Sequence, residues 1–273
     1  MKRIIVPTDF SENARNAMNY AADMAVSLHA GIALLHVCQL PASEIPVSGE
    51  VLDKWFSDAQ KELDKLKADL LERTSGKIKV FDEVKTGFFL AELQDYCDQS
   101  KPYAVVMGTQ GAGAIERFVF GSSTIGAMKH LGWPLIIVPP DAKFTEIRKI
   151  GLACDMKKVA ATTPVDGIKS FVKELGASLV VIHINTGNDY KYGPAIVDQS
   201  SQLQAMLDEL HPSYRFIEGD DIEEGLDEVA RQGEIDLLIV VPKKHNMVES
   251  IFHRSQSKQI AMHTRVPVMS LHE

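Results

Sequence analysis

The sequence predicts an α/β protein built from two tandem, doubly wound parallel five-stranded sheets. Short apolar runs bounded by turn residues, such as 104–107, alternate with longer segments whose apolar residues recur at helical spacing. Runs of the first kind are typical of parallel strands that are buried on both faces. The same alternation occurs twice, so that 149–155 corresponds to 3–9. Because crossovers between parallel strands are right-handed, each repeat is expected to form a doubly wound sheet.

Five strands are expected in the first repeat. They cover residues 3–6, 32–37, 77–84, 104–107 and 134–138. The run at 77–84 alternates apolar and polar residues, which predicts a strand at the edge of the sheet.

The helices between these strands are marked by caps and apolar periodicity. Ser11 is a suitable N-cap for the first helix, and Gly31 is expected to end it. A longer helix carries an apolar stripe over 52–70. A third helix is expected to start at Gly87, and a fourth to cover 124–131.

The second repeat contains the same signals. Its strand-like runs are 149–155, 179–184, 236–241 and 266–268, which correspond to 3–9, 32–37, 103–108 and 133–135. Thr163, Pro164 and Asp166 have the order of a helix start, a cap followed by proline in the first turn. The repeats join near 140–146, so the predicted domains are residues 1–141 and 146–273.

Composition excludes several classes of partner. The chain has 273 residues, 45% hydrophobic and 24% charged, which is ordinary for a soluble globular protein. Its net charge of −8 argues against nucleic acid and anionic membranes, which both need a clustered basic surface. The N-terminus lacks the apolar length of a signal peptide, and no run is long enough to span a bilayer. We therefore expect a cytoplasmic protein without nucleic-acid or membrane partners.

Cys38, Cys97 and Cys154 are scattered, with no C-x-x-C pair. Such an odd, sparse set fits a reducing compartment and argues against a disulfide framework. Buried, small apolar residues are the favoured interpretation. Redox reactivity of Cys38 and Cys154, which lie at expected strand ends, is the alternative.

The stretch 108–123 follows a predicted strand and leads into a predicted helix. Gly108 and Gly111 allow close approach of a ligand to the backbone, or a positive φ. Gly121, Ser122 and Ser123 open the helix, where free N–H groups and hydroxyls suit a phosphate. The stretch is neither a G-x-x-x-x-G-K-[ST] loop nor the G-x-G-x-x-G of a dinucleotide fold.

Three features in order resemble the universal stress protein (UspA-like) family. They are the spacing Gly108-x2-Gly111-x9-Gly121-Ser122, an opening strand that ends in Asp9, and Leu34-Leu-His-Val37 closing the second strand. The resemblance implies a Rossmann-like fold with strand order 3-2-1-4-5. It also implies that the two halves pair through their fifth strands as an intramolecular pseudo-dimer. The implied ligand is ATP or AMP, with Mg²⁺ on the phosphates as a further expectation.

The expected nucleotide-binding residues surround the carboxyl ends of the strands. Asp9 lies where open α/β sheets bind ligands, although a strand-end carboxylate or helix cap is the alternative. The hydroxyl residues after Gly121 serve phosphate binding, helix capping or both. The resemblance adds four strand-end residues that bracket adenosine in family members. The full set is Pro7, Thr8, Asp9, Val37, Met107, Gly108, Gly111, Gly121, Ser122, Ser123 and Thr124.

No metal or catalytic residues are expected. His36 and His183 occupy matched strand positions, which favours packing over metal binding. No Ser-His-Asp or Cys-His arrangement stands out from the sequence.

The second glycine stretch has diverged. In an alignment without gaps, Gly108 becomes Val241, Gly111 becomes Lys244, Gly121 becomes Arg254 and Ser122 becomes Ser255. Large side chains should close a site that needs bare backbone, so one nucleotide per chain is expected. The alternative is that Lys244 and Arg254 bind a different anion.

These observations predict a nucleotide-dependent regulatory module of the stress response. An unidentified regulatory protein is the expected partner, and pairing into a homodimer is left open. One alternative is a slow ATPase, against which the glycine stretch lacks a lysine and the sequence offers no evident general base. The other is an interaction scaffold that does not depend on a nucleotide.

Overall fold

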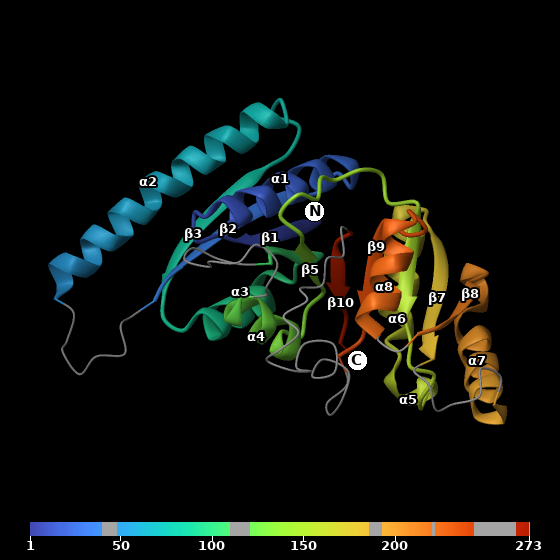
Figure 1. Cartoon of the computed structure of the whole chain (residues 1–273). Helices are drawn as coiled ribbons and strands as arrows, with labels where there is room; N and C mark the ends of the chain where they lie inside the picture. The colour runs from blue at the N-terminus through green and yellow to red at the C-terminus, as the bar shows by residue number, and fades with distance from the viewer. Residues whose placement is uncertain (40–47, 110–120, 186–192, 220–221, 243–265, 273) are drawn as a thin grey trace. The chain divides into compact units, whose positions relative to one another are not determined.

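The computed structural model describes residues 1–39, 48–109, 121–185, 193–219, 222–242 and 266–272. The chain divides into two compact units, Met1–Phe144 and Thr145–Glu273. The division falls inside the segment 140–146 that joins the two repeats. Figure 1 shows both units with their elements labelled.

The first unit holds a parallel five-stranded sheet. Its strands are β1 (Arg3–Pro7), β2 (Gly31–Cys38), β3 (Val80–Thr86), β4 (Ala104–Gly108) and β5 (Leu135–Val138). Their order is β3-β2-β1-β4-β5, and every neighbouring pair is parallel. In the central strand, Ile4 faces Ile32 on one side and Ala104 on the other. The predicted order 3-2-1-4-5 and the edge position of β3 are both confirmed, although β3 begins at Val80 instead of 77.

Four helices cover this sheet, namely α1 (Glu12–Ser27), α2 (Gly49–Arg73), α3 (Phe89–Ser100) and α4 (Ser122–His130). Figure 1 shows α1 and α2 on one face and α3 and α4 on the other. A doubly wound sheet requires this division, because the chain leaves β1 in one direction and returns to β4 in the other.

The ends of α1 test two predictions. Ser11 is the N-cap, as predicted, and its hydroxyl accepts a hydrogen bond of 3.2 Å from the backbone N–H of Ala14. Gly31 does not end the helix, which stops at Ser27; the left-handed position after it belongs to His29, with φ 52°. Gly31 instead begins β2, where a Cβ atom would lie 3.0 Å from the carbonyl oxygen of Lys79. Close strand packing therefore explains this glycine.

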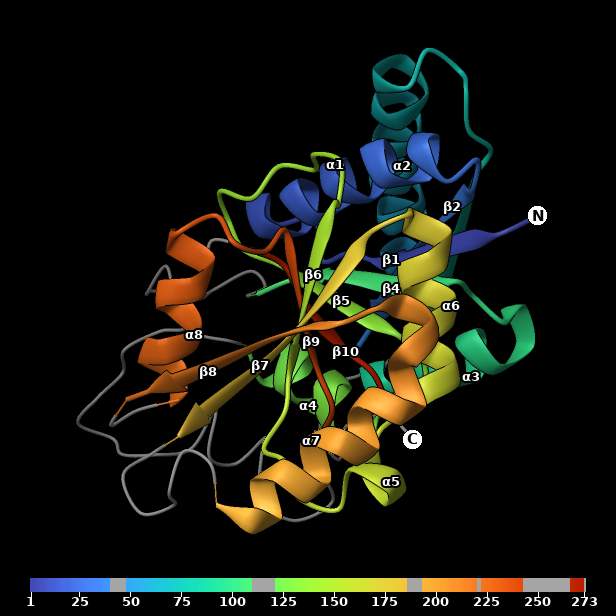
Figure 2. The same cartoon turned by 90° about the vertical axis from the view of Figure 1, so that its right-hand side faces the viewer.

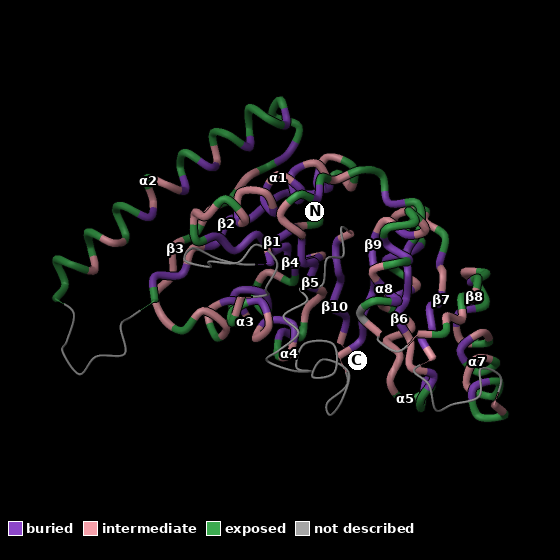
Figure 3. The backbone as a smooth tube through the Cα atoms, viewed as in Figure 1, coloured by how far each residue is buried: buried purple, intermediate pink, exposed green. Residues whose placement is uncertain are grey.

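The apolar stripe of α2 is buried from Ala59 onward. Ala59, Leu63, Leu66 and Leu70 are buried, whereas the Phe56 side chain nearer the start is 38% exposed. Figure 3 shows the buried positions on the side of α2 that faces the sheet.

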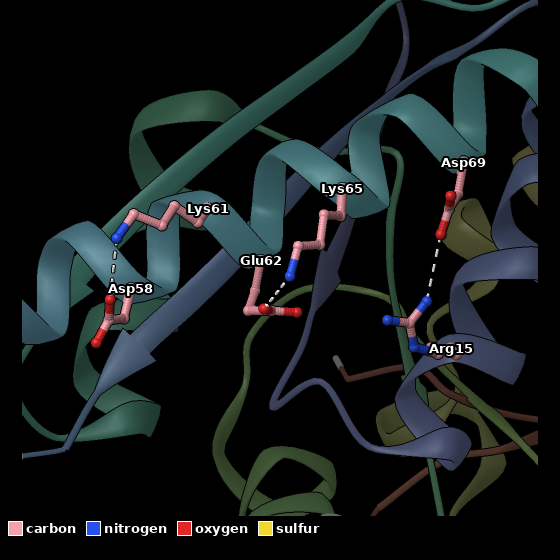
Figure 4. A network of polar contacts seen from close by, with 6 residues as sticks. All are labelled: Arg15, Asp58, Lys61, Glu62, Lys65 and Asp69. Atoms are coloured by element: carbon pink, nitrogen blue, oxygen red, sulfur yellow. Dashed lines mark hydrogen bonds and ion pairs between the residues drawn. The ribbon is translucent and has the colours of Figure 1, made fainter.

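Ion pairs accompany this packing on the surface. Figure 4 shows Arg15 of α1 pointing toward Asp69 of α2, with 3.3 Å between Nη1 and Oδ2. Asp58 pairs with Lys61 at 3.2 Å and Glu62 with Lys65 at 2.5 Å along α2 itself. Exposed pairs of this kind contribute at most about 1 kcal/mol each, so burial carries most of the stability of this helix.

The second unit repeats the design. Its strands are β6 (Lys149–Ala153), β7 (Ser178–Asn185), β8 (Ser213–Glu218), β9 (Leu237–Val240) and β10 (Val268–Ser270), in the order β8-β7-β6-β9-β10. Neighbouring strands are again parallel. The second unit therefore has the same 3-2-1-4-5 order as the first.

Among its described residues, the second unit has helices α5 (Val159–Thr162), α6 (Val165–Leu175), α7 (Pro194–Leu207) and α8 (Ile222–Arg231), with a 3₁₀ turn, η1 (Asp208–Leu210). Figure 2 shows α6 and α7 on one face of the sheet and α8 on the other. The start of α6 differs from prediction: Pro164 is the N-cap residue, and no side chain caps the helix.

Candidate functional site

The first unit has a cavity of about 330 Å³ at the carboxyl ends of its strands. It lies where β1 and β4 are neighbours, the point at which the chain reverses direction across the sheet. Open α/β sheets bind ligands at this switch point. The described residues that line it are Pro7, Thr8, Asp9, Ala14, His36, Val37, Gln39, Phe89, Met107, Gly108, Gly121, Ser122, Ser123 and Thr124.

Every predicted binding residue that the structure describes lines this cavity. Gly111 lies outside the described residues. Val37 and Met107 at strand ends are buried, as is Thr124 in the first turn of α4, whereas Asp9, Ser122 and Ser123 are exposed. The arrangement therefore combines apolar walls with an exposed carboxylate and an exposed helix start.

Four lining residues were not predicted, namely Ala14, His36, Gln39 and Phe89. Ala14 and Phe89 belong to the first turns of α1 and α3, which pack where β1 and β3 end. Gln39 follows the last residue of β2. The sequence signal that could have identified these residues is their position, since each of them lies next to the carboxyl end of a strand. His36 was interpreted as a packing residue, and it both packs and lines the cavity.

A tight turn connects β1 to α1 beside the cavity. The Thr8 hydroxyl accepts a 3.0 Å hydrogen bond from the Phe10 N–H, and Asp9 Oδ1 accepts one of 3.1 Å from the Ser11 N–H. Phe10 has φ 66°, a left-handed conformation that costs a residue with a side chain about 1–2 kcal/mol. The His36 Nδ1 lies 2.8 Å from the Thr8 carbonyl oxygen. Because a carbonyl only accepts, His36 Nδ1 carries the proton.

The start of α4 faces the same cavity. Its N-cap is Gly121, which has no side chain with which to cap the helix. The first N–H groups of a helix have no partner within it, and the helix dipole adds positive potential there. Thr124 holds the helix to β4, because its hydroxyl donates a 3.1 Å hydrogen bond to the Gly108 carbonyl. The first turn of α4 is therefore a fixed group of donors suited to an anion.

Neither described glycine of this stretch has a positive φ, and close approach explains Gly108. Gly121 has φ −65°, and Gly108 is not among the described residues with positive φ. A Cβ atom on Gly108 would lie 2.8 Å from the carbonyl oxygen of Asn13. The backbone of α1 is thus a neighbour that requires a glycine at 108, and the contact of this glycine with a ligand stays a prediction.

Burial lowers the reactivity of two of the three thiols. Desolvation raises the pKa of Cys97 to about 12, with a smaller contribution from the charge of Asp98, and burial also raises the pKa of Cys38. A thiol with a raised pKa is mostly protonated at neutral pH and therefore a weak nucleophile. The apolar interpretation fits both residues, and redox chemistry at Cys38 is disfavoured.

The second unit has a smaller cavity at the corresponding place. Its volume is about 100 Å³, and it is lined by Ala153, Cys154, Asp155, Lys157, Ile182, His183, Ile184, Asn185, Ile222 and Leu226. Val241, which replaces Gly108, is buried. Lys244, Arg254 and Ser255 lie outside the described residues. The described part of this cavity has less than a third of the volume found in the first unit.

Within the described ranges, no group of three or more His, Cys, Asp or Glu residues could hold a metal ion. None of the described helices combines the length and apolar character that crossing a bilayer demands.

Comparison with known proteins identifies the family. The family model described as the universal stress protein family matches residues 1–139. The chain is a universal stress protein. A universal stress protein of Methanocaldococcus jannaschii is 25% identical over 145 residues, which cover 52% of this chain and 84% of that protein. One of Mycolicibacterium smegmatis is 27% identical over 222 residues, covering 76% and 72% of the two chains.

A solved structure of another protein has the same fold as this chain. The crystal structure of a universal stress protein from Archaeoglobus fulgidus has a TM-score of 0.70 and covers 99% of this chain and 96% of that one. Sequence identity is 18%, so this likeness concerns the fold alone. It extends the shared fold over both units.

Proposed function

We propose that this universal stress protein binds one adenine nucleotide, ATP or AMP, in the cavity of its first unit. The single observation that carries the proposal is the convergence of Asp9 and the uncapped start of α4 on one cavity at the switch point. Its volume of about 330 Å³ falls within the usual range for small-molecule sites.

Each part of the nucleotide has a suitable neighbour in this proposal. The carboxylate of Asp9 accepts a hydrogen bond from a ribose hydroxyl or from adenine. Val37 and Met107 offer apolar contact to the base, and Pro7 and Thr8 contribute strand-end backbone. The N–H groups and hydroxyls of residues 122–124 receive the phosphates, and Gly111 belongs to the same loop. Backbone donors at a helix start suit phosphate without any cationic side chain.

Mg²⁺ on the phosphates is compatible with the described residues. This ion prefers oxygen ligands and usually keeps several waters beside one or two carboxylates. Asp9, the carboxylate among the described lining residues, is assigned to the nucleoside, so the Ser122 and Ser123 hydroxyls would hold the ion together with phosphate oxygens and water. Mg²⁺ would neutralise phosphate charge there.

The role we propose is regulatory. The chain would act in the cytoplasm as a nucleotide-dependent module of the stress response, with a regulatory protein as its partner. No lysine or arginine is among the described residues that line the cavity, so charge developing on a transferred phosphoryl group has little side-chain stabilisation. Hydrolysis is therefore expected to be slow at most.

Mass spectrometry of the ligand released from purified, denatured protein tests the proposal directly. Titration calorimetry of the full chain with ATP and with AMP then gives affinity and stoichiometry. We expect one nucleotide per chain and little phosphate release in a single turnover. A chain that retains no nucleotide and binds neither compound would instead support a nucleotide-independent scaffold.

A further inference from the structure

His36 contacts the strand-end turn at two points. Its Nδ1–H donates to the carbonyl oxygen of Thr8 at 2.8 Å, and its ring lies 4.5 Å from that of Phe10, tilted by 30°. Between these contacts stands Asp9, whose carboxylate accepts the Ser11 N–H. A left-handed residue such as Phe10 persists only where its surroundings hold it.

The second unit repeats this geometry with different residues. His183 Nδ1 lies 2.9 Å from the Cys154 carbonyl oxygen, and Met156 has φ 53°. Asp155 Oδ1 accepts a 3.0 Å hydrogen bond from the Lys157 N–H. Thr8 and Phe10 are replaced by cysteine and methionine, yet the turn keeps its shape. The histidine and the aspartate are the side chains common to both turns.

The strand pairing beneath the two turns is also the same. The Thr8 N–H donates to the Leu35 carbonyl at 2.9 Å, and the Cys154 N–H donates to the Ile182 carbonyl at 2.9 Å. Each histidine directly follows the residue that accepts this bond. The turn is thus specified by the fold and one histidine, and it forms in a unit whose cavity is small.

We infer that His36 is a positioning residue for the nucleotide site. It fixes the Thr8 carbonyl and thereby the orientation in which Asp9 meets the ligand. This inference rests on the proposed nucleotide binding, to which it adds a residue of β2 that touches the turn. Both the neutral Nδ1–H form and the imidazolium donate from Nδ1, so the contact survives protonation.

The test compares two substitutions at His36 in the full chain. His36→Asn retains a donor, because the side-chain amide nitrogen of Asn stands as many bonds from Cβ as Nδ1 does. His36→Leu removes it. By calorimetry we expect His36→Leu to bind ATP about tenfold more weakly, as the loss of one hydrogen bond predicts. His36→Asn should remain within about threefold of the wild type.

The second unit offers a matched control. His183→Leu removes the equivalent contact and should lower the unfolding midpoint about as much as His36→Leu does, while ATP affinity stays unchanged. The inference is overturned if His36→Leu binds as tightly as the wild type. It is equally overturned if His36→Asn is no better than His36→Leu, or if His183→Leu loses as much affinity.

A ligand-free measurement separates this inference from the proposed function. The backbone amide NMR signals of Thr8, Asp9 and Phe10 should shift in His36→Leu and stay close to wild-type positions in His36→Asn. Unshifted signals in His36→Leu contradict the positioning role. A wild-type chain that does not bind ATP rejects the proposed function, and these signals still decide whether His36 holds the turn.

Discussion

Asp9 carries two contacts whose effects separate experimentally. Its carboxylate supports the turn by accepting the Ser11 N–H, and we propose that it also accepts a hydrogen bond from the nucleotide. Asp155 supports the equivalent turn in the second unit. The two aspartates therefore form a matched pair in which one member faces the larger cavity.

Asp9→Ala should reduce adenine-nucleotide affinity by roughly tenfold to a hundredfold, since hydrogen bonds to charged groups contribute about 1.5–3 kcal/mol. Asp155→Ala should lower the unfolding midpoint as much as Asp9→Ala does, and it should leave the nucleotide affinity unchanged. Calorimetry and thermal melts of both variants measure this. Equal affinity losses in the two would remove the special role of Asp9.

Gly108→Ala probes the close approach of α1 to β4. A Cβ atom 2.8 Å from the Asn13 carbonyl oxygen forces a backbone shift, so we expect a loss of about 1–3 kcal/mol in unfolding free energy. Gly132→Ala is the control, because its Cβ would meet nothing closer than 4.0 Å. Denaturant titration measures the unfolding free energy of both variants. A Gly108→Ala chain as stable as the control would return this glycine to the ligand-based explanation.

At the scale of single elements, a carboxylate at the start of α4 is expected to raise the stability of the fold and to weaken nucleotide binding. Gly121→Asp should cap the helix and favour its dipole, raising unfolding free energy by a few tenths of a kcal/mol. The same carboxylate should repel phosphate and weaken ATP binding. Gly121→Ser is the control, because serine is an uncharged N-cap residue that is preferred about as strongly as aspartate. If Gly121→Asp and Gly121→Ser bind ATP equally, the phosphates do not lie at this helix start.

The packing of α2 against β3 should depend on pH. The hydrogen bond from Lys67, 2.5 Å from Oδ1, is the main cause that lowers the pKa of Asp82, and Gln60 adds a second. A lowered pKa stabilises the fold above the unfolded value of about 3.9 and loses that contribution as pH falls through the folded pKa.

Lys67→Met should therefore reduce unfolding free energy by about 0.5–1 kcal/mol at pH 7. The difference from the wild type should shrink as pH falls below about 3.9. Urea titrations at pH 7 and below about pH 3.9 measure this difference in unfolding free energy, with Lys61→Met as an exposed control. A difference that does not change with pH would show that Lys67 acts through packing alone.

Strands were more predictable than what surrounds them. Buried parallel strands are local apolar runs, so the sequence predicts their positions and, with right-handed crossovers, the sheet type. The apolar stripe of α2 was predicted too, but periodicity does not tell whether a neighbour covers it. This helix of 25 residues is about 37 Å long, whereas β3 with 7 residues spans about 23 Å. Its first turns therefore extend past the strand.

The site was predictable where it follows strand ends and not where it depends on packing. Asp9 follows from the rule that ligands bind at carboxyl ends, whereas Val37 was implied by the family resemblance. The role of His36 could not be predicted, because its contact with Thr8 exists only once β1 and β2 are paired in register. The same is true of Gly108, whose neighbour Asn13 belongs to another element.

At the scale of the whole molecule, two units of one fold differ in cavity volume, about 330 Å³ against about 100 Å³. We expect one nucleotide per full chain by calorimetry, bound more weakly in Asp9→Ala and with unchanged affinity in Asp155→Ala. Two equivalent nucleotides per chain would show that the second unit binds as well. Pairing of the halves through their fifth strands stays a prediction.

The repeated turn has an evolutionary consequence. Its contacts run between the strand end and a histidine of the neighbouring strand, in both units. A duplicated half can therefore accumulate substitutions that fill its cavity and still fold. Under the proposed function the ligand constrains the first copy alone, while the histidine and the aspartate contact the turn in both copies.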